Sequence, residues 1–267
     1  MMARTYVVTG SASGIGEEVA RILKSQGQIV VGVDLHDADI EADLSTASGR
    51  SSAITQIVER TKGVIDVVIA NAGLALPIAK TVSVNFFGVV DLVNGLLPTL
   101  AKSASPRVVV TSSMASLMPN DADLVDAMLS LDESVALKRA EELVAEGGGL
   151  EGLIYGSSKR AIGRWIRKVA PTTDFAGAGI AINAIGPGIV ETPMTKEMIA
   201  TEEAKAGLLQ VVPMPLNGIM KPEVIAKALI WLGSEDNSHM TGQTIYVDGG
   251  ADVVLRGEDI WSKLDKS

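Results

Sequence analysis

Short apolar runs alternate along the chain with longer stretches that have helical periodicity. The runs that indicate strands cover residues 5–10, 29–34, 64–73, 107–113, 180–188 and 243–250. Apolar residues at helical spacing occur near residues 15–26, 49–61, 81–100, 153–170, 196–209 and 222–233. Because the strand-like runs are continuously apolar, they are typical of a parallel sheet that is buried on both faces. We therefore predict an α/β fold of the Rossmann type, with one doubly wound parallel sheet, in a single domain over residues 1–267.

Residues 114–152 interrupt this rhythm, because they separate a predicted strand from the helix that follows it. Their apolar residues are spaced as in one or two helices, and the glycines at 147–149 should end the last of them. We predict a helical insertion within the domain. The polar tail 258–267 contains one tryptophan and is open to two interpretations, a surface extension or a small packing arm.

The composition narrows the classes of function. The formal net charge of −9 argues against nucleic acid and anionic membranes as partners. With no cysteine and two histidines, the chain has no disulfide, no thiol nucleophile and no classical zinc site, so we predict no metal. No secretory signal is visible, and the apolar region from Val64 to Val84 is too interrupted by polar residues and proline to cross a bilayer. We predict a cytoplasmic protein that binds no membrane.

A glycine-rich turn joins the first strand to the first helix. The sequence VVTGSASGIG places Gly10, Gly14 and Gly16 where the backbone can approach a pyrophosphate at a helix N-terminus. The spacing differs from the commonest dinucleotide-binding fingerprint, and an ordinary turn can carry the same glycines. The position of the turn, between a strand and a helix, favours a nucleotide site.

Asp34 ends the second strand and is placed to accept hydrogen bonds from an adenosine ribose diol. Its carboxylate would repel a 2′-phosphate, and no lysine or arginine lies at positions 10–16 or directly after Asp34. We therefore predict NAD rather than NADP. The alternative is that Asp34 only begins a turn with His36 and Asp37.

Tyr155 and Lys159 stand four residues apart on one face of the predicted helix. Lowering a phenol pKa from ~10 to the region of 7–8 requires about 3–4 kcal/mol. A lysine ammonium ~4 Å away supplies about 4 kcal/mol at an effective dielectric constant of ~20. The pair can therefore form a proton donor and acceptor that works near neutral pH. The alternative is a tyrosine and a lysine that snorkel at the edge of the core.

The chain resembles the classical short-chain dehydrogenase/reductase family. The resemblance rests on an ordered set of motifs that spans nearly the whole chain: TGSASGIG (9–16), ADL (42–44), NAG (71–73), VNFFG (84–88), TSS (111–113), YGSSK (155–159) and PGIVETP (187–193). The resemblance implies an enzyme that transfers a hydride between a secondary alcohol or ketone and a nicotinamide cofactor. Enoyl reductases and sugar epimerases of related fold fit the spacing of these motifs less well.

The resemblance also implies roles for four catalytic residues. Tyr155 would be the general acid and base, and Lys159 would lower its pKa and bind the nicotinamide ribose. Ser113, preferred over Ser112, would donate a hydrogen bond to the substrate oxygen. Asn85 would lie in a helix and hold a water that links Lys159 to solvent.

The implied cofactor residues lie in several of these motifs. Asp43 and Leu44 would flank the adenine, Asn71 would be partly structural, and the Thr192 hydroxyl would bind the carboxamide. The full predicted set comprises Gly10, Ser13, Gly14, Ile15, Gly16, Asp34, Leu35, Asp43, Leu44, Asn71, Ala72, Gly73, Tyr155, Lys159, Pro187, Gly188, Val190 and Thr192.

The separation of Ser113 from Tyr155 is unusually long for the family, and it resembles bacterial hydroxysteroid dehydrogenases that carry a helical insertion there. Residues 30–50, 81–88 and 247–256 are similar to the same group. We expect an apolar alcohol or ketone as substrate, with a hydroxysteroid as the leading case. A smaller cyclic alcohol or diol remains an alternative, as does a nucleotide-sensing protein without catalysis.

The segment 194–220 should cover the substrate, although most of its apolar residues can simply pack on the sheet. We expect a homo-oligomer, with a homodimer favoured over the tetramer common in the family. The insertion would then cover a surface used in tetramers, unless it folds away from that surface.

Overall fold

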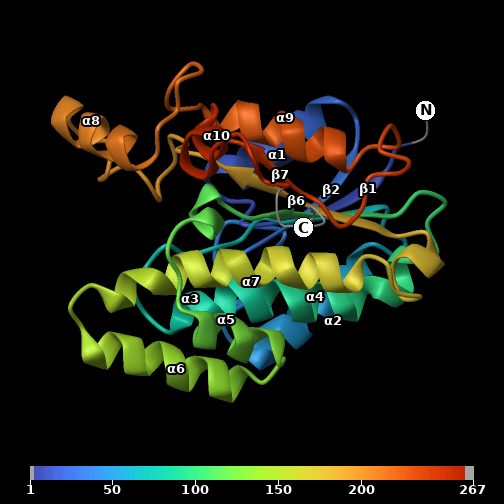
Figure 1. The fold of residues 1–267 in the computed structure, drawn as a ribbon. Coiled ribbons are helices and arrows are strands. Elements are labelled where there is room, and N and C mark those ends of the chain that lie inside the picture. The colour runs from blue at the N-terminus through green and yellow to red at the C-terminus, as the bar shows by residue number, and fades with distance from the viewer. Residues whose placement is uncertain (1–2, 262–267) are drawn as a thin grey trace.

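The computed structural model describes residues 3–261 of the chain. Seven parallel strands form one sheet in the order β3-β2-β1-β4-β5-β6-β7 (Figure 1). Their bounds are β1 (Thr5–Thr9), β2 (Ile29–Asp34), β3 (Ile40–Glu41), β4 (Val67–Ala70), β5 (Arg107–Thr111), β6 (Ala181–Pro187) and β7 (Thr244–Val247). The order reverses between β1 and β4, where a doubly wound sheet opens its ligand cleft. The predicted fold class is confirmed, and the short β3 was not foreseen.

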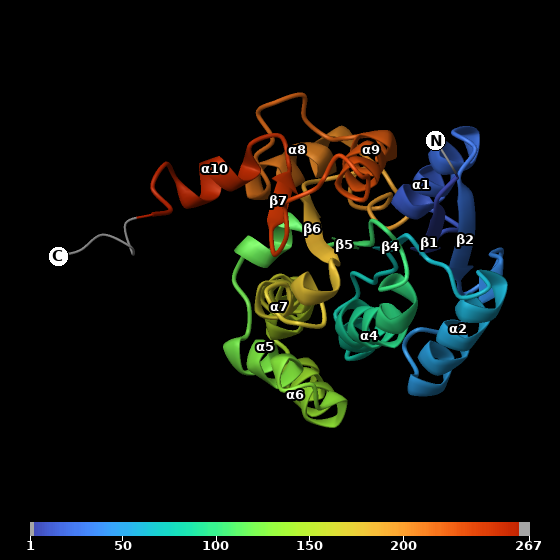
Figure 2. The same cartoon turned by 90° about the vertical axis from the view of Figure 1, so that its right-hand side faces the viewer.

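Helices cover both faces of the sheet. The longer ones are α1 (Gly14–Ser25), α2 (Ala47–Arg60), α4 (Gly88–Leu100), α7 (Leu153–Val169) and α9 (Pro222–Leu232). Figure 2 shows α1 and α9 on one face and α2, α4 and α7 on the other. Each face of the sheet has its own hydrophobic core. Along β5, Val108 and Val110 lie in the core beneath α2, α4 and α7, and Val109 lies in the core beneath α1 and α9. Both faces of each strand are therefore buried, which explains the continuous apolar runs.

The run from Lys80 to Leu100 is continuous in the structure but changes its winding. It consists of α3 (Lys80–Val82), the π-helical turn η1 (Ser83–Phe87) and α4. By length and composition this helix is apolar enough to cross a membrane, yet 67% of its most apolar window is buried inside the fold. This helix is therefore buried to the extent that is typical of a helix in the core of a folded domain. The π turn places Asn85, and such turns often occur at functional sites.

The insertion folds as a helical hairpin of α5 (Ala122–Leu129) and α6 (Glu133–Glu146), as the apolar spacing predicts. The carboxylates of Asp121 and Asp132 accept hydrogen bonds from the first turns of these helices. After α6, glycines 147–149 all have positive φ values of 66°, 67° and 94°, so this triplet ends the helix as expected. The remaining short elements between β5 and α7 are η2 (Met114–Leu117) and η3 (Leu150–Gly152).

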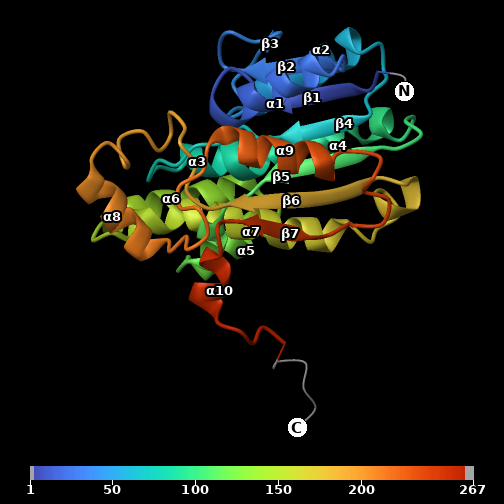
Figure 3. The same cartoon turned by 90° about the horizontal axis from the view of Figure 1, so that it is seen from above.

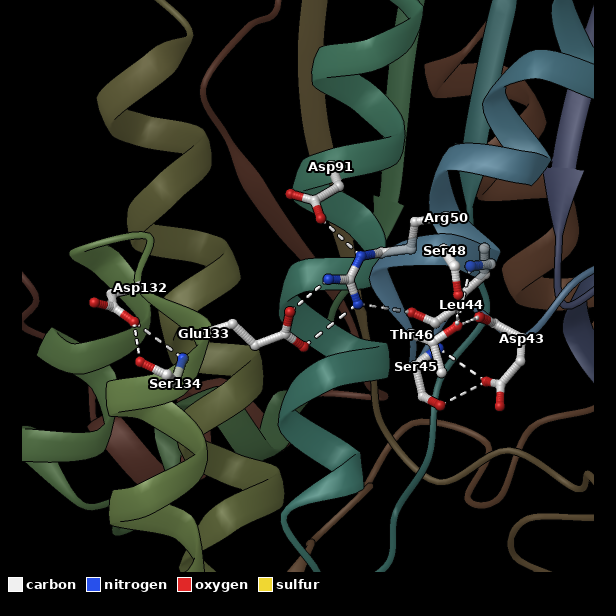
Figure 4. A network of polar contacts seen from close by, with 11 residues as sticks. Asp43, Leu44, Ser45, Thr46, Ser48, Arg50, Asp91, Asp132, Glu133 and Ser134 are labelled. Atoms are coloured by element: carbon white, nitrogen blue, oxygen red, sulfur yellow. Dashed lines mark hydrogen bonds and ion pairs between the residues drawn. The ribbon is translucent and has the colours of Figure 1, made fainter.

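A buried arginine ties the insertion to the rest of the fold (Figure 4). Arg50 on α2 is 2% exposed, and its guanidinium donates to Asp91 of α4, to Glu133 at the start of α6, and to the carbonyl oxygen of Leu44. A buried guanidinium is tolerated only when such partners are present. The hairpin thus packs along the helical layer instead of folding away from it (Figure 1).

Beyond β6 the chain departs from the predicted pattern. The helix expected at 196–209 is α8 (Glu202–Val211), which begins later because the Thr201 hydroxyl caps it by accepting from the Ala204 amide at 3.1 Å. The short η4 (Ala176–Ala178) precedes β6. A further helix, α10 (Ala251–Arg256), follows β7 and projects from the body (Figure 3). Ile260 and Trp261 of the predicted tail are exposed, and residues 262–267 lie outside the described part.

Candidate active site

A cleft of about 450 Å³ lies at the carboxyl ends of the central strands. It gathers nearly all the predicted site residues, although they come from segments far apart in the sequence. Of the predicted residues, only Gly16 and Asn85 do not line it, and both lie directly behind its wall. Sequence reasoning did not place the following lining residues there: Ala42, Leu74, Leu76, Ile78, Lys80, Val84, Thr111, Pro193 and Thr195. Ala42, Val84, Thr111 and Pro193 belong to the quoted motifs without having been assigned to the site, and the other five lie outside any motif.

The glycine-rich turn requires glycine at two kinds of position. Gly10 and Gly14 have φ values of +67° and +57°, which other residues rarely adopt. A Cβ on Gly16 would lie 2.0 Å from the Gly10 carbonyl oxygen, so only glycine lets α1 begin this close to β1. The turn thus leaves an open backbone surface at the N-terminus of a helix, which suits a pyrophosphate.

Asn71 holds the wall of the cleft between β1 and β5. Its amide N–H donates to the Thr9 hydroxyl at 3.0 Å, and its side-chain oxygen accepts from the Thr111 hydroxyl at 2.9 Å. The Ala72 N–H donates to the same Thr9 oxygen, also at 3.0 Å. These bonds fit the structural part of the role predicted for Asn71.

Asp34 lies at the far end of the cleft with its carboxylate held in place. It accepts from the backbone N–H of Ala12 at 2.9 Å and from that of Leu35 at 2.7 Å. A carboxylate can accept up to about four hydrogen bonds, so capacity for a ribose diol remains. The ribose role of Asp34 stays a prediction.

Lys80 is a cation in the cleft that sequence reasoning missed, because it lies far from Asp34 along the chain. Its ammonium lies 3.3 Å from the carboxylate of Asp43, which also lines the cleft. The Ser45 hydroxyl is the main cause of the lowered pKa of Asp43, and Lys80 adds to it. Lys80 is thus paired with the carboxylate that is predicted to flank the adenine.

The Tyr155–Lys159 pair lies on α7 beside the end of β5. Lys159 is 4% exposed, and its ammonium donates to the Thr111 carbonyl oxygen at 2.9 Å. The ammonium nitrogen is 5.8 Å from the centre of the Tyr155 ring. Ser113 faces Tyr155 from the start of η2, and its hydroxyl oxygen accepts from the Ala115 N–H at 3.1 Å. Ser112 instead donates to the Lys159 carbonyl at 3.3 Å, which supports the preference for Ser113.

Burial disfavours the charged forms of both residues, the Tyr155 phenolate and the Lys159 ammonium. Burial raises the pKa of Tyr155, and the Ser113 hydroxyl opposes this rise. Burial lowers the pKa of Lys159 to about 8. In the chain by itself the pKa of Tyr155 is therefore raised, contrary to the expectation that Lys159 would lower it. The physical reason is the desolvation of the buried phenol, and the Lys159 ammonium is hydrogen-bonded to the Thr111 carbonyl oxygen.

Asn85 lies behind the cleft and is 1% exposed. Its side-chain amide pairs with the backbone of Leu74, accepting from N at 2.8 Å and donating to O at 2.9 Å. It also donates to the Ser158 hydroxyl at 3.0 Å, which bonds to the Tyr155 carbonyl at 2.7 Å. Asn85 therefore fixes the loop after β4 to the helix that carries Tyr155. Its role in holding a water stays a prediction.

Gly73 separates Asn85 from Lys159. A Cβ on Gly73 would lie 3.2 Å from the Asn85 side-chain oxygen and 3.5 Å from the Lys159 ammonium. The missing side chain therefore keeps the two polar groups close to each other.

The open side of the cleft is apolar. Leu76, Ile78 and Met194 line it and are 51%, 39% and 47% exposed. Within the segment 194–220, Met214 and Met220 are instead buried in the core, as the packing alternative proposed. α8 has no buried residue. The exposed apolar side chains thus lie where the cleft meets solvent.

Comparisons with known proteins identify the family to which the chain belongs. Residues 4–124 match the family model described as short chain dehydrogenase, and residues 132–252 match the model described as enoyl-(acyl carrier protein) reductase. The 3-alpha-hydroxysteroid dehydrogenase/carbonyl reductase of Comamonas testosteroni is 34% identical over 94% of this chain and 97% of its own length. The chain therefore belongs to the short-chain dehydrogenase/reductase family, and the prediction of an NAD(P)-dependent oxidoreductase is confirmed.

Two further relatives bear on the substrate. The crystal structure of the 3-alpha-hydroxysteroid dehydrogenase from Pseudomonas sp. B-0831 complexed with NADH has a TM-score of 0.87 and 34% identity, and the match covers 96% of this chain and all of that one. The cis-4-hydroxycyclohexanecarboxylate dehydrogenase of Sinomonas cyclohexanicum is 27% identical over 94% of this chain and 97% of its own length.

The burial of Lys159 predicts a pH-dependent stability. Because its pKa is about 8 in the folded chain and 10.5 ordinarily, the unfolded chain binds more protons between these values. The free energy of unfolding of the wild type should thus rise with pH relative to Lys159→Met, by up to about 3 kcal/mol. Urea denaturation from pH 7 to 10.5 measures the difference. Lys168→Met, at an exposed site on the same helix, is the control, and a pH-independent difference would contradict the prediction.

Proposed function

We propose that this chain is an NAD(H)-dependent dehydrogenase that interconverts a secondary alcohol and a ketone by hydride transfer. A hydroxysteroid or another apolar cyclic compound is its substrate. The observation that carries the proposal is the convergence of Ser113, Tyr155 and Lys159 at one end of a cleft whose other end holds the glycine turn and Asp34. A cytoplasmic location is part of the proposal.

The cleft fits a nicotinamide dinucleotide. Gly10 and Gly14 leave room for a pyrophosphate, and Asp34 offers carboxylate oxygens to a ribose. When bound, NAD(H) accepts or supplies the hydride. Pro187, Gly188, Val190 and Thr192 line the cleft near Tyr155 and Lys159 and would hold the nicotinamide end.

The proton is moved by the chain's own residues. In reduction, Tyr155 donates its proton to the carbonyl oxygen, and Ser113 donates a hydrogen bond as negative charge develops there. In oxidation, the Tyr155 phenolate accepts the proton of the alcohol. Because burial raises the pKa of Tyr155, the ammonium of Lys159 and the positive charge of an oxidised nicotinamide must together favour the phenolate. The oxidation rate should therefore rise with pH.

The apolar mouth of the cleft supports an apolar substrate. A fused-ring skeleton would cover Leu76, Ile78 and Met194, and burying apolar surface contributes about 25 cal/mol per Å². The relatives named for hydroxysteroids support the larger substrate, and the cyclohexanecarboxylate dehydrogenase supports a smaller ring as the second candidate.

The decisive experiment compares kcat/KM for NAD and NADP with androsterone-like steroids, cyclohexanols and short polar alcohols. We expect turnover with the apolar rings and at least a tenfold preference for NAD. Asp34→Ala should reduce that preference, because it removes the carboxylate that repels a 2′-phosphate. A preference of the wild type for NADP, or turnover confined to short polar alcohols, would contradict the proposal.

Tyr155→Phe should lower kcat by about 10²–10⁴-fold, the usual contribution of general acid–base catalysis. The affinity for NADH, measured by fluorescence titration, should change less than about twofold because the ring remains. Lys159→Ala should instead weaken both binding and turnover. Near-normal turnover in Tyr155→Phe would mean that the proton leaves by another route.

A homodimer completes the proposal. The helical hairpin 121–146 packs beside α7 and is held to α2 and α4 through Arg50, so it occupies a helical face that tetramers of the family would need. Light scattering of the purified protein should give twice the chain mass of 27.8 kDa. A stable tetramer would show that the hairpin leaves the interface free.

A further inference from the structure

Tyr246 on β7 lies against the backbone that carries Ser113. It pairs in register with Gly186 on β6. A Cβ on Gly186 would lie 2.6 Å from Cδ1 of the tyrosine ring and 3.6 Å from the carbonyl carbon of Ser113. The glycine therefore makes room for the ring next to the start of η2.

The hydroxyl of Tyr246 is bonded to this turn. Its oxygen lies 2.9 Å from the hydroxyl of Ser116, which is 4% exposed. The backbone N–H of Ser116 donates to the Ser113 carbonyl at 3.1 Å, and the Ala115 N–H donates to the Ser113 hydroxyl at the same distance. Tyr246 is thus connected to Ser113 through a single turn of backbone.

The same turn is held from α7 by Arg160, the residue after Lys159. Its guanidinium donates to the carbonyl oxygen of Ser116, and to that of Met118 at 3.3 Å. The turn therefore has one anchor on the helix of the proton-transferring residues and another on β7.

The C-terminal helix holds Tyr246 from outside. The guanidinium of Arg256 lies 5.7 Å from the centre of the Tyr246 ring and is paired with Asp252 at 2.7 Å. The start of α10 is held by the buried carboxylate of Asp248, which accepts from Gly250 N at 3.0 Å and from Asp252 N at 2.8 Å. Figure 2 shows how α10 leaves the body directly after β7.

We propose that Tyr246 is a positioning residue for Ser113, acting through its hydroxyl bond to Ser116. The inference rests on the proposed function, in which Ser113 binds the substrate oxygen. Neither Tyr246 nor Ser116 lines the cleft, so both act through the turn. The position of the Ser113 hydroxyl matters because a displacement of about 1 Å can cost about 100-fold in rate. The alternative is that the Tyr246 ring only fills the space above Gly186.

Tyr246→Phe separates the two readings, because it keeps the ring and removes only the hydroxyl. With Ser113 present, we expect kcat/KM for ketone reduction to fall about five- to tenfold through kcat, in line with the loss of one hydrogen bond. In the Ser113→Ala background, the same change should cost less than about twofold, since the residue being positioned is gone. Affinity for NADH should be unchanged.

Tyr6→Phe is the matched control, because it removes the hydroxyl of another buried tyrosine, which lies near the start of the central strand β1. It should leave kcat/KM as in the wild type. Wild-type kcat/KM in Tyr246→Phe, or an equal loss in both Ser113 backgrounds, would overturn the proposal.

Amide hydrogen exchange supplies a readout that needs no turnover. Tyr246→Phe should speed exchange at Ala115 and Ser116 by about five- to tenfold, and Tyr6→Phe should not. If the wild type reduces no ketone, the proposed function fails, but the exchange rates still test whether the Tyr246–Ser116 hydrogen bond holds the turn. Unchanged exchange in Tyr246→Phe overturns the positioning role whatever the activity.

Discussion

The buried ammonium of Lys159 is the constraint around which the site is built. Removing a charge from water is costly unless hydrogen-bond acceptors replace the lost hydration. The chain offers the Thr111 carbonyl at the end of β5, keeps Gly73 free of a side chain, and places the Asn85 amide beyond it. With a pKa of about 8, the lysine is charged at neutral pH but can lose its proton under mildly alkaline conditions. A fully solvated lysine would not respond in this range.

This constraint fixes the neighbouring elements relative to one another. The carbonyl acceptor comes from a strand, the ammonium from α7, and the amide from the π turn of a third helix. A π turn adds one residue to the helical winding, which aims Asn85 at the loop after β4 while the apolar residues before and after it stay in the core. The π turn is thus the local irregularity that brings the polar side chain of Asn85 to the loop after β4.

The sequence predicts the sheet and most helices, and nearly every site residue that it predicts lines the cleft, because the motifs fall where elements end. Cleft residues that lie outside the motifs are not predicted in this way. Lys80 and Leu76 reach the cleft only through the path of the loop after β4, which no periodicity encodes. The spacing of Tyr155 and Lys159 predicts a lowered phenol pKa because it reveals the lysine charge, but it does not reveal the burial that raises this pKa. Tyr246 is invisible in sequence, because its contact with Ser116 joins residues 130 positions apart.

The buried guanidinium of Arg50 has a consequence for the order in which the chain folds during synthesis. Its first carboxylate partner, Asp91, follows 41 residues later, and the second, Glu133, follows 83 residues later. Until Glu133 leaves the ribosome, α2 and α4 can dock with only one of the two carboxylates that pair with Arg50. The set of polar partners that surrounds the buried Arg50 is therefore complete only after the insertion has been made, which links the packing of α2 and α4 to a much later part of the chain.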